Sequence, residues 1–219
     1  MDLTALYEKA ATTVSSTFKH CSTVKDFSGK CNHITQIGVT STSLFIASLA
    51  SEPQVYQLFV KIQQNIETLK TLLIETKLNT KLDLNLSPKL DGEIGLTDML
   101  ILDTFKSYKE LNLQLYKRFG YVSKYIIIPG TFAFGDRGED GHSPGLMQAI
   151  TEFTNQNTDW KIVHNSIDNN GLVILGNVDQ IAADAEKIYS MVSFDIPEVR
   201  WVERFTVGMP TSYNDLSFE

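Results

Sequence analysis

Residues 31–50, Cys-Asn-His-Ile-Thr-Gln-Ile-Gly-Val-Thr-Ser-Thr-Ser-Leu-Phe-Ile-Ala-Ser-Leu-Ala, decide the fold of this chain. An apolar run from Ile34 to Val39 breaks at Gly38 and is followed by three small hydroxyl residues, Thr40, Ser41 and Thr42. A helical apolar pattern then begins at Ser43. A strand, a turn of small residues and a helix present backbone N–H groups and a helix N-terminus to a ligand. Because one glycine is not a glycine-rich fingerprint, an ordinary connection between strand and helix is the alternative from these residues alone.

The composition is that of an ordinary globular protein, since 42% of the 219 residues are hydrophobic and 21% are charged. The formal net charge of −7 argues against non-specific nucleic-acid binding, which needs a basic face to neutralise phosphates. No apolar run approaches the roughly 20 residues that span a bilayer. The N-terminus lacks the basic start and apolar stretch of a signal peptide. Cys21 and Cys31 are expected as free thiols in a reducing cytosol, with a disulfide as the alternative, so we expect a cytoplasmic protein.

Strand and helix patterns alternate along the chain. Strands are predicted over residues 34–39, 55–60, 81–86, 99–102, 124–128, 160–165 and 172–175. Helices are predicted over residues 3–18, 43–50, 66–76, 108–119, 144–155 and 179–193. Residues 19–30 are polar and are expected to be irregular. Gly120 is expected to cap the fourth of these helices, and Pro144 to occupy the first position of the fifth.

This order predicts an α/β fold: a Rossmann-like, doubly wound, mostly parallel seven-stranded sheet that ends in an antiparallel hairpin, with helices on both faces. The segment Asp168-Asn-Asn-Gly171 is the turn signal of that hairpin. The short apolar run 99–102 is typical of a central strand buried on both faces. We expect a single domain over 1–219, comprising an N-terminal helical extension (1–30), a core (31–176) and a C-terminal helix and tail (177–219).

Several segments within this order are similar to one known family. They are residues 31–39, Asp98-Met-Leu-Ile-Leu-Asp-Thr104, Lys124-Tyr-Ile-Ile-Ile-Pro-Gly-Thr131, and Pro144-Gly-Leu-Met-Gln-Ala-Ile150 followed by Asn169-Asn-Gly-Leu-Val-Ile-Leu175. The chain resembles class I S-adenosylmethionine-dependent methyltransferases over roughly residues 31–175. Within them it looks like the group of sugar (rhamnosyl) O-methyltransferases and cephalosporin hydroxylase-like proteins.

The resemblance implies that S-adenosylmethionine binds over the strand ends and that a methyl group passes to a hydroxyl, on a small molecule, a sugar or a glycan. Such a step needs an aligned acceptor oxygen and a group that helps to remove its proton. The residues that would hold the cofactor are Gly38, Thr40, Ser41, Thr42, Gln57 and Asp103. Gln57 stands in because no Asp or Glu occurs between Val55 and Asn65, where the family places an acid for the ribose.

The sequence departs from the family where relatives hold a divalent metal. Pro129-Gly130 stands in place of the His-Asp pair that follows the fifth strand, and Lys106-Ser107 replaces a histidine after the fourth. These departures make metal dependence doubtful. Asp103 and Asp136 are the weak candidates for metal ligands.

Four residues are candidates for the chemistry. Asp103 follows the buried central strand, where a carboxylate projects toward a ligand, and a capping or turn role is the alternative. Lys106 and Tyr108 follow within one turn of chain and could orient or deprotonate the acceptor, with plain surface positions as the alternative. His142 lies in the long 129–145 loop, and loops of this length are often lids over a site, so it could act as a base. A solvated loop histidine is the alternative.

The missing acid and the missing His-Asp pair leave a second hypothesis open. The chain could be a degenerate, non-catalytic methyltransferase-fold module that serves binding or scaffolding in a glycan-modifying system. The sequence names neither the acceptor nor the oligomeric state.

Overall fold

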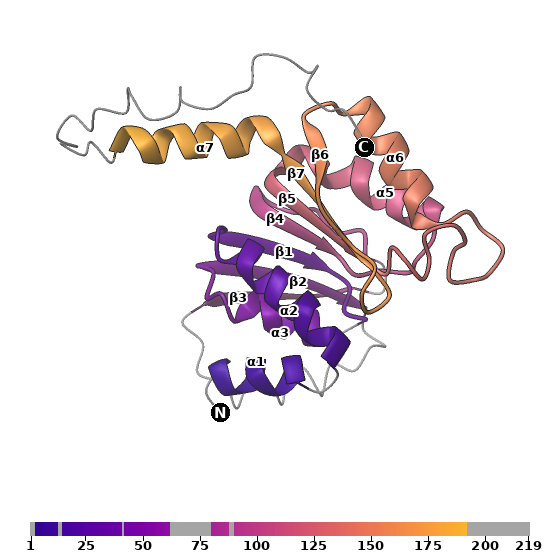
Figure 1. Cartoon of the computed structure of the whole chain (residues 1–219), viewed down its shortest axis with the longest axis horizontal. Helices are drawn as coiled ribbons and strands as arrows, with labels where there is room; N and C mark the ends of the chain where they lie inside the picture. Colours follow the sequence, from indigo (N-terminus) through magenta and orange to yellow (C-terminus); the bar gives the residue numbers. More distant parts are fainter. Residues whose placement is uncertain (1–2, 13–14, 41, 62–79, 88–89, 192–219) are drawn as a thin grey trace, which may run out of the picture. The chain divides into compact units, whose positions relative to one another are not determined.

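The structure of the chain is a computed structural model that describes residues 3–12, 15–40, 42–61, 80–87 and 90–191 (Figure 1). Its helices are α1 (Leu3–Thr12), α2 (Ser15–Ser28), α3 (Thr42–Leu49), α5 (Tyr108–Arg118), α6 (Leu146–Gln156) and α7 (Val178–Met191). Its strands are β1 (His33–Ile37), β2 (Val55–Lys61), β3 (Lys81–Ser87), β4 (Thr97–Leu102), β5 (Val122–Pro129), β6 (Trp160–Ser166) and β7 (Leu172–Asn177). The helix expected over 66–76 lies outside the described residues.

The strands form one sheet in the order β3-β2-β1-β4-β5-β7-β6. Strands β1 to β5 are parallel to one another, and β7 runs antiparallel to both of its neighbours, β5 and β6. The chain adds β2 and β3 on one side of β1, and β4 and β5 on the other. The strand order therefore reverses between β1 and β4, the position at which doubly wound folds bind ligands. The predicted fold class is confirmed.

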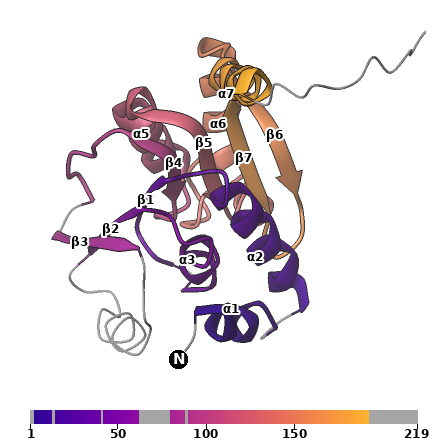
Figure 2. The same ribbon diagram turned by 90° about the vertical axis from the view of Figure 1, so that its left-hand side faces the viewer.

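The sheet separates two apolar layers, which Figure 2 shows nearly edge-on. Helices α1, α2 and α3 cover one face, and α5 and α6 cover the other. Neighbouring residues of the central strands alternate between the two layers: Met99 and Ile101 face the first, and Leu100 and Leu102 face the second. Burial on both faces explains why these strands are continuous apolar runs rather than alternating ones.

Residues Met1–Ala183 form one compact unit, and Asp184–Glu219 form a second, of which the structure describes only the end of α7. The expectation of a single domain stays a prediction. In the described part of the chain, no helix combines the length and the apolar character that crossing a bilayer requires. Both cysteines are free thiols and are buried.

Three local predictions were wrong. The N-terminal segment holds two helices, and α2 covers most of the stretch that was expected to be irregular. Although the sequence of α2 is mostly polar, one side of the helix is buried, and it consists of small or uncharged residues: His20, Cys21, Val24 and Ser28. Gly120 does not cap α5, because the chain tightens after Arg118 into the 3-10 turn Phe119–Tyr121. Pro144 precedes α6, since Gly145 is the capping residue and Pro144 pairs with Arg137 across the preceding loop.

A buried polar chain ties β1 to β2 and α3. The Tyr56 hydroxyl donates to Gln36 Oε1 at 2.5 Å and lies 2.7 Å from Ser48 Oγ. Gln36 Nε2 in turn donates to the carbonyl of Gly38 at 2.9 Å, at the turn that follows β1. All three side chains are fully buried. Burial raises the pKa of Tyr56 far above its usual range, so this hydroxyl stays protonated and able to donate.

The Tyr56→Phe variant tests this chain. It leaves Gln36 Oε1 buried without its donor, so we expect the free energy of unfolding to fall by about 1–3 kcal/mol. Urea denaturation measures the change as a lower midpoint at an unchanged slope. Tyr121→Phe is the control, because its ring is 49% exposed, and its midpoint should stay close to that of the unsubstituted chain.

Candidate functional site

The candidate site lies where β1 and β4 end side by side. Gly38 follows β1 with φ +79°, a left-handed conformation that favours glycine. A Cβ at this position would stand 2.4 Å from the carbonyl oxygen of Asp103. The backbone N–H of Asp103 donates to the carbonyl of Ile37 at 2.9 Å. Gly38 is therefore required for the two strand ends to meet this closely.

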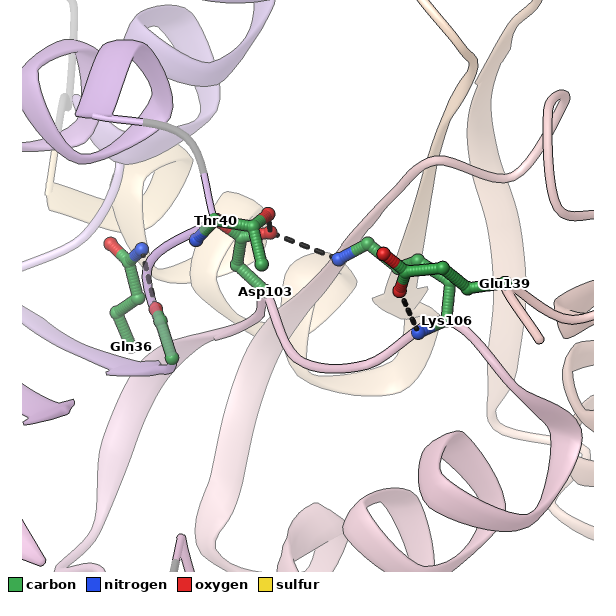
Figure 3. Close-up of polar contacts among 6 residues, drawn as sticks. Gln36, Thr40, Asp103, Lys106 and Glu139 are labelled. Atoms are coloured by element: carbon green, nitrogen blue, oxygen red, sulfur yellow. Dashed lines mark hydrogen bonds and ion pairs between the residues drawn. The ribbon is translucent and has the colours of Figure 1, made fainter. Parts of the chain in front are cut away.

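Asp103 is the centre of the site. Its carboxylate accepts hydrogen bonds from the backbone N–H of Thr40 at 2.7 Å and from the Thr40 hydroxyl. Lys106 Nζ lies 2.9 Å from Asp103 Oδ1, the oxygen that also accepts the Thr40 hydroxyl (Figure 3). Asp103 is 1% exposed and Lys106 7% exposed, so this ion pair is shielded from water. A buried charge needs such partners, and their arrangement fixes the position of the carboxylate.

The loop after β5 closes over Lys106. Glu139 accepts the backbone N–H of Lys106 at 3.1 Å, and its own N–H donates to the Lys106 carbonyl at 2.7 Å. The same loop is held at its start by the β6–β7 hairpin, since the N–H groups of Phe132 and Ala133 both donate to the carbonyl of Asn170. The loop is thus attached on both sides of the strand ends.

These elements surround a cavity of about 300 Å³. Its lining comes from α2, α3, the ends of β1, β4 and β5, the loop and the hairpin: His20, Thr40, Ser43, Leu44, Asp103, Lys106, Pro129, Gly130, Phe134, Glu139, Asn169 and Asn170. This volume lies at the lower end of the range for small-molecule sites. The cavity combines charged, amide and aromatic side chains at the crevice where the strand order reverses.

The structure brings some of the predicted residues together. Asp103, Lys106 and Thr40 line the cavity, and Gly38 packs against the main chain of Asp103. Thr42 begins α3 and is exposed, and Ser41 lies outside the described residues.

Two other candidates lie away from the cavity lining. Gln57 is in the middle of β2, paired in register with Thr35 and Asp83, so it does not stand at the strand end where the ribose acid was expected. The Tyr108 hydroxyl donates to Glu152 on α6 at 2.6 Å, and this bond raises the pKa of Tyr108. Tyr108 therefore ties α5 to α6 instead of facing the cavity.

The two loop candidates are exposed. His142 is held through its backbone N–H by Asp140, whose pKa is lowered by hydrogen bonds from the N–H groups of Ser143 and His142. Asp136 is also exposed and does not line the cavity with Asp103. Among the described residues, no three His, Cys, Asp or Glu side chains gather in a group that could hold a metal ion.

Sequence reasoning gave no site role to several of the lining residues, among them Asn169, Asn170 and His20. Asn169 and Asn170 were assigned only to a turn, yet with Gly171 they adopt positive φ values that place the hairpin tip at the cavity. His20 gave no signal, because its segment was expected to be irregular. It is 2% exposed, and burial lowers its pKa below the usual value, so the imidazole is neutral near pH 7.

Comparison with known proteins shows the fold. No protein-family model matches the chain, and no curated protein matches its sequence. The cofactor-bound structure of Rv0187 from MTB has a TM-score of 0.58 at 11% identity, covering 80% of this chain and 89% of that one. The O-methyltransferase TomG from Streptomyces achromogenes, in complex with SAM, has a TM-score of 0.53 at 11% identity, covering 73% and 79%.

The N-methyltransferase NodS from Bradyrhizobium japonicum has a TM-score of 0.52 at 10% identity, covering 75% of this chain and 98% of that one. The chain has the class I methyltransferase fold. At identities this low the likeness shows the fold alone, and it does not extend to the narrower sugar O-methyltransferase group.

Substituting Gly38 tests the junction of β1 and β4. Gly38→Ala forces a left-handed alanine and places Cβ against Asp103, so we expect unfolding free energy to fall by about 2 kcal/mol or more. Gly95→Ala is the matched control, because no heavy atom lies within 4 Å of its Cβ position. Urea unfolding should leave Gly95→Ala unchanged or slightly stabilised, and equal midpoints for the two variants would contradict the role of Gly38.

Proposed function

We propose that this chain is an S-adenosylmethionine-dependent O-methyltransferase whose acceptor is a hydroxyl group of a sugar or glycan. The observation that carries the proposal is the cavity at the β1–β4 crevice, with the Asp103 carboxylate buried in its wall. The sugar as acceptor rests on the sequence resemblance alone. The two buried free thiols support the expectation of a reducing, cytoplasmic compartment.

The residues of the cavity fit the methionine part of this cofactor. That part carries an ammonium and a carboxylate group, and the Asp103 carboxylate already holds an ammonium, that of Lys106. The N-terminus of α3, which begins at Thr42, suits a carboxylate. When bound, the cofactor supplies a methyl group on a sulfonium centre. The side chains around it have to orient the acceptor hydroxyl and accept its proton.

A specific observation favours the second candidate, a non-catalytic module. The carboxyl end of β2 is Phe59-Val-Lys61, and no acid occurs between Val55 and Asn65 to bind the ribose hydroxyls. In this alternative the fold is kept for binding or scaffolding and the cofactor is not held.

Calorimetry of the full chain with S-adenosylhomocysteine separates the two. We expect saturable binding with a dissociation constant on the order of micromolar, together with a rise in unfolding temperature at excess ligand. Asp103→Asn removes the charge that the ammonium group needs, so its affinity should fall about tenfold or more.

Asp98→Asn is the matched control, since Asp98 lies at the opposite end of β4 and accepts the N–H groups of Asn32 and His33 there. Its affinity should equal that of the unsubstituted chain. Absence of binding to both S-adenosylmethionine and S-adenosylhomocysteine would refute the proposed function and favour the second candidate, a non-catalytic module.

A further inference from the structure

His20 is a buried side chain with an unused hydrogen-bonding atom. It is 2% exposed and lines the cavity, and its Nε2 atom has no hydrogen-bond partner among the described residues. A buried polar atom without a partner carries a desolvation cost, so native structures keep few of them. Because His20 lines the cavity, a ligand group that reaches Nε2 would supply the missing partner.

The position of the ring is fixed by the β6–β7 hairpin. A hydrogen bond to the main chain of Asp168 and the nearby Asp168 carboxylate favour its protonated form, while burial and His164 oppose it, and burial is the largest effect. An exposed ion pair between Lys19 and Asp168, at 3.2 Å, lies beside this contact and adds little to it. The imidazole is therefore held in place by the hairpin and kept neutral by burial.

The other charges around the cavity leave His20 as its neutral proton acceptor. Asp103 and Lys106 are paired with each other, and Glu139 is bound to the main chain of Lys106. Helix α3 contributes only Ser43 and Leu44 to the lining. Asp103 is the partner proposed for the cofactor's ammonium group, and a protonated Lys106 has no lone pair to offer. Among the described lining residues, His20 Nε2 is the buried neutral nitrogen that has no hydrogen-bond partner.

We propose that His20 Nε2 is the general base of the transfer and accepts the hydroxyl proton of the acceptor. This inference rests on the proposed function. In the step, a bond forms between the acceptor oxygen and the methyl carbon, and the bond from that carbon to sulfur breaks. The hydroxyl proton passes to Nε2, so the positive charge of the sulfonium ends on the imidazolium, and S-adenosylhomocysteine leaves as a neutral thioether.

The cavity selects a neutral acceptor with several hydroxyl groups. Among the described lining residues, the charged side chains are two carboxylates, Asp103 and Glu139, and one ammonium, Lys106, a balance that disfavours an acidic acceptor. The amides of Asn169 and Asn170 both donate and accept hydrogen bonds, as hydroxyl groups require. Phe134 adds an aromatic ring to the same lining.

The test uses the full chain, methyl-labelled S-adenosylmethionine and the methyl glycosides of glucose, galactose, mannose and rhamnose, with gluconate as an acidic comparison. His20→Gln should lower kcat/KM with the best glycoside about a hundredfold or more, with S-adenosylhomocysteine affinity unchanged. In the unsubstituted chain, kcat/KM should rise with pH as His20 loses its proton, because only neutral imidazole acts as a base. The rise should reach its plateau before about pH 6.5, since the pKa of His20 is lowered. His20→Gln should lose this rise.

Lys19→Met is the matched control on the same helix, because it breaks the ion pair with Asp168 but keeps the imidazole. Its kcat/KM should stay within about threefold of the unsubstituted chain. Circular dichroism confirms that each variant is folded, and the histidine 15N spectrum of the unsubstituted chain should show the Nε2 signal of His20 moving when the glycoside binds.

The outcomes separate the two proposals. Loss of S-adenosylhomocysteine binding in the unsubstituted chain overturns the proposed function itself. Binding with no transfer to any glycoside overturns the proposed sugar acceptor and, with it, the role of His20. Preference for gluconate, or a His20→Gln variant that keeps its rate or its pH dependence, overturns the further inference alone. An unmoved Nε2 signal on glycoside binding also overturns it, even if His20→Gln fails to fold.

Discussion

The ion pair and hydrogen bonds of Asp103 are the interactions on which the site depends. The carboxylate is buried at the end of a central strand and joins the turn after β1, through Thr40, to the segment after β4, through Lys106. An unpaired carboxylate here would be costly, so its partners must be in place whenever the chain is folded. Gly38 is the matching constraint on the backbone, because only a residue without Cβ lets β1 approach Asp103.

Two further sets of hydrogen bonds fix the segments around this ion pair. Beneath the turn, the Ser48–Tyr56–Gln36 chain reaches the carbonyl of Gly38 and links the crevice to the packed face of the sheet. On the open side, the hairpin main chain at Asn170 holds the loop after β5, and the ring of His20 is bound at Asp168. The cavity is therefore assembled from segments far apart in the sequence, each fixed by bonds to its neighbour.

The sequence predicted the fold well because its strongest signals are local. Buried apolar runs such as 99–102, the glycine after β1 and the Asn-Asn-Gly turn each specify an element without reference to the rest of the chain. The prediction failed where tertiary packing decides. Helix α2 has a polar sequence and forms against the sheet, so His20 gave no signal, and Gln57 was placed by strand membership alone although the register puts it mid-strand. His142 was singled out by loop length, a property that does not specify where the side chain points.

The most direct test of this account is a crystal structure of the full chain with S-adenosylhomocysteine. We expect the ligand over the carboxyl ends of β1 and β4, with its amino group bonded to Asp103 and its sulfur facing the cavity wall that contains His20. A ligand bound elsewhere on the molecule, or a crevice left without ligand at saturating concentration, would contradict it.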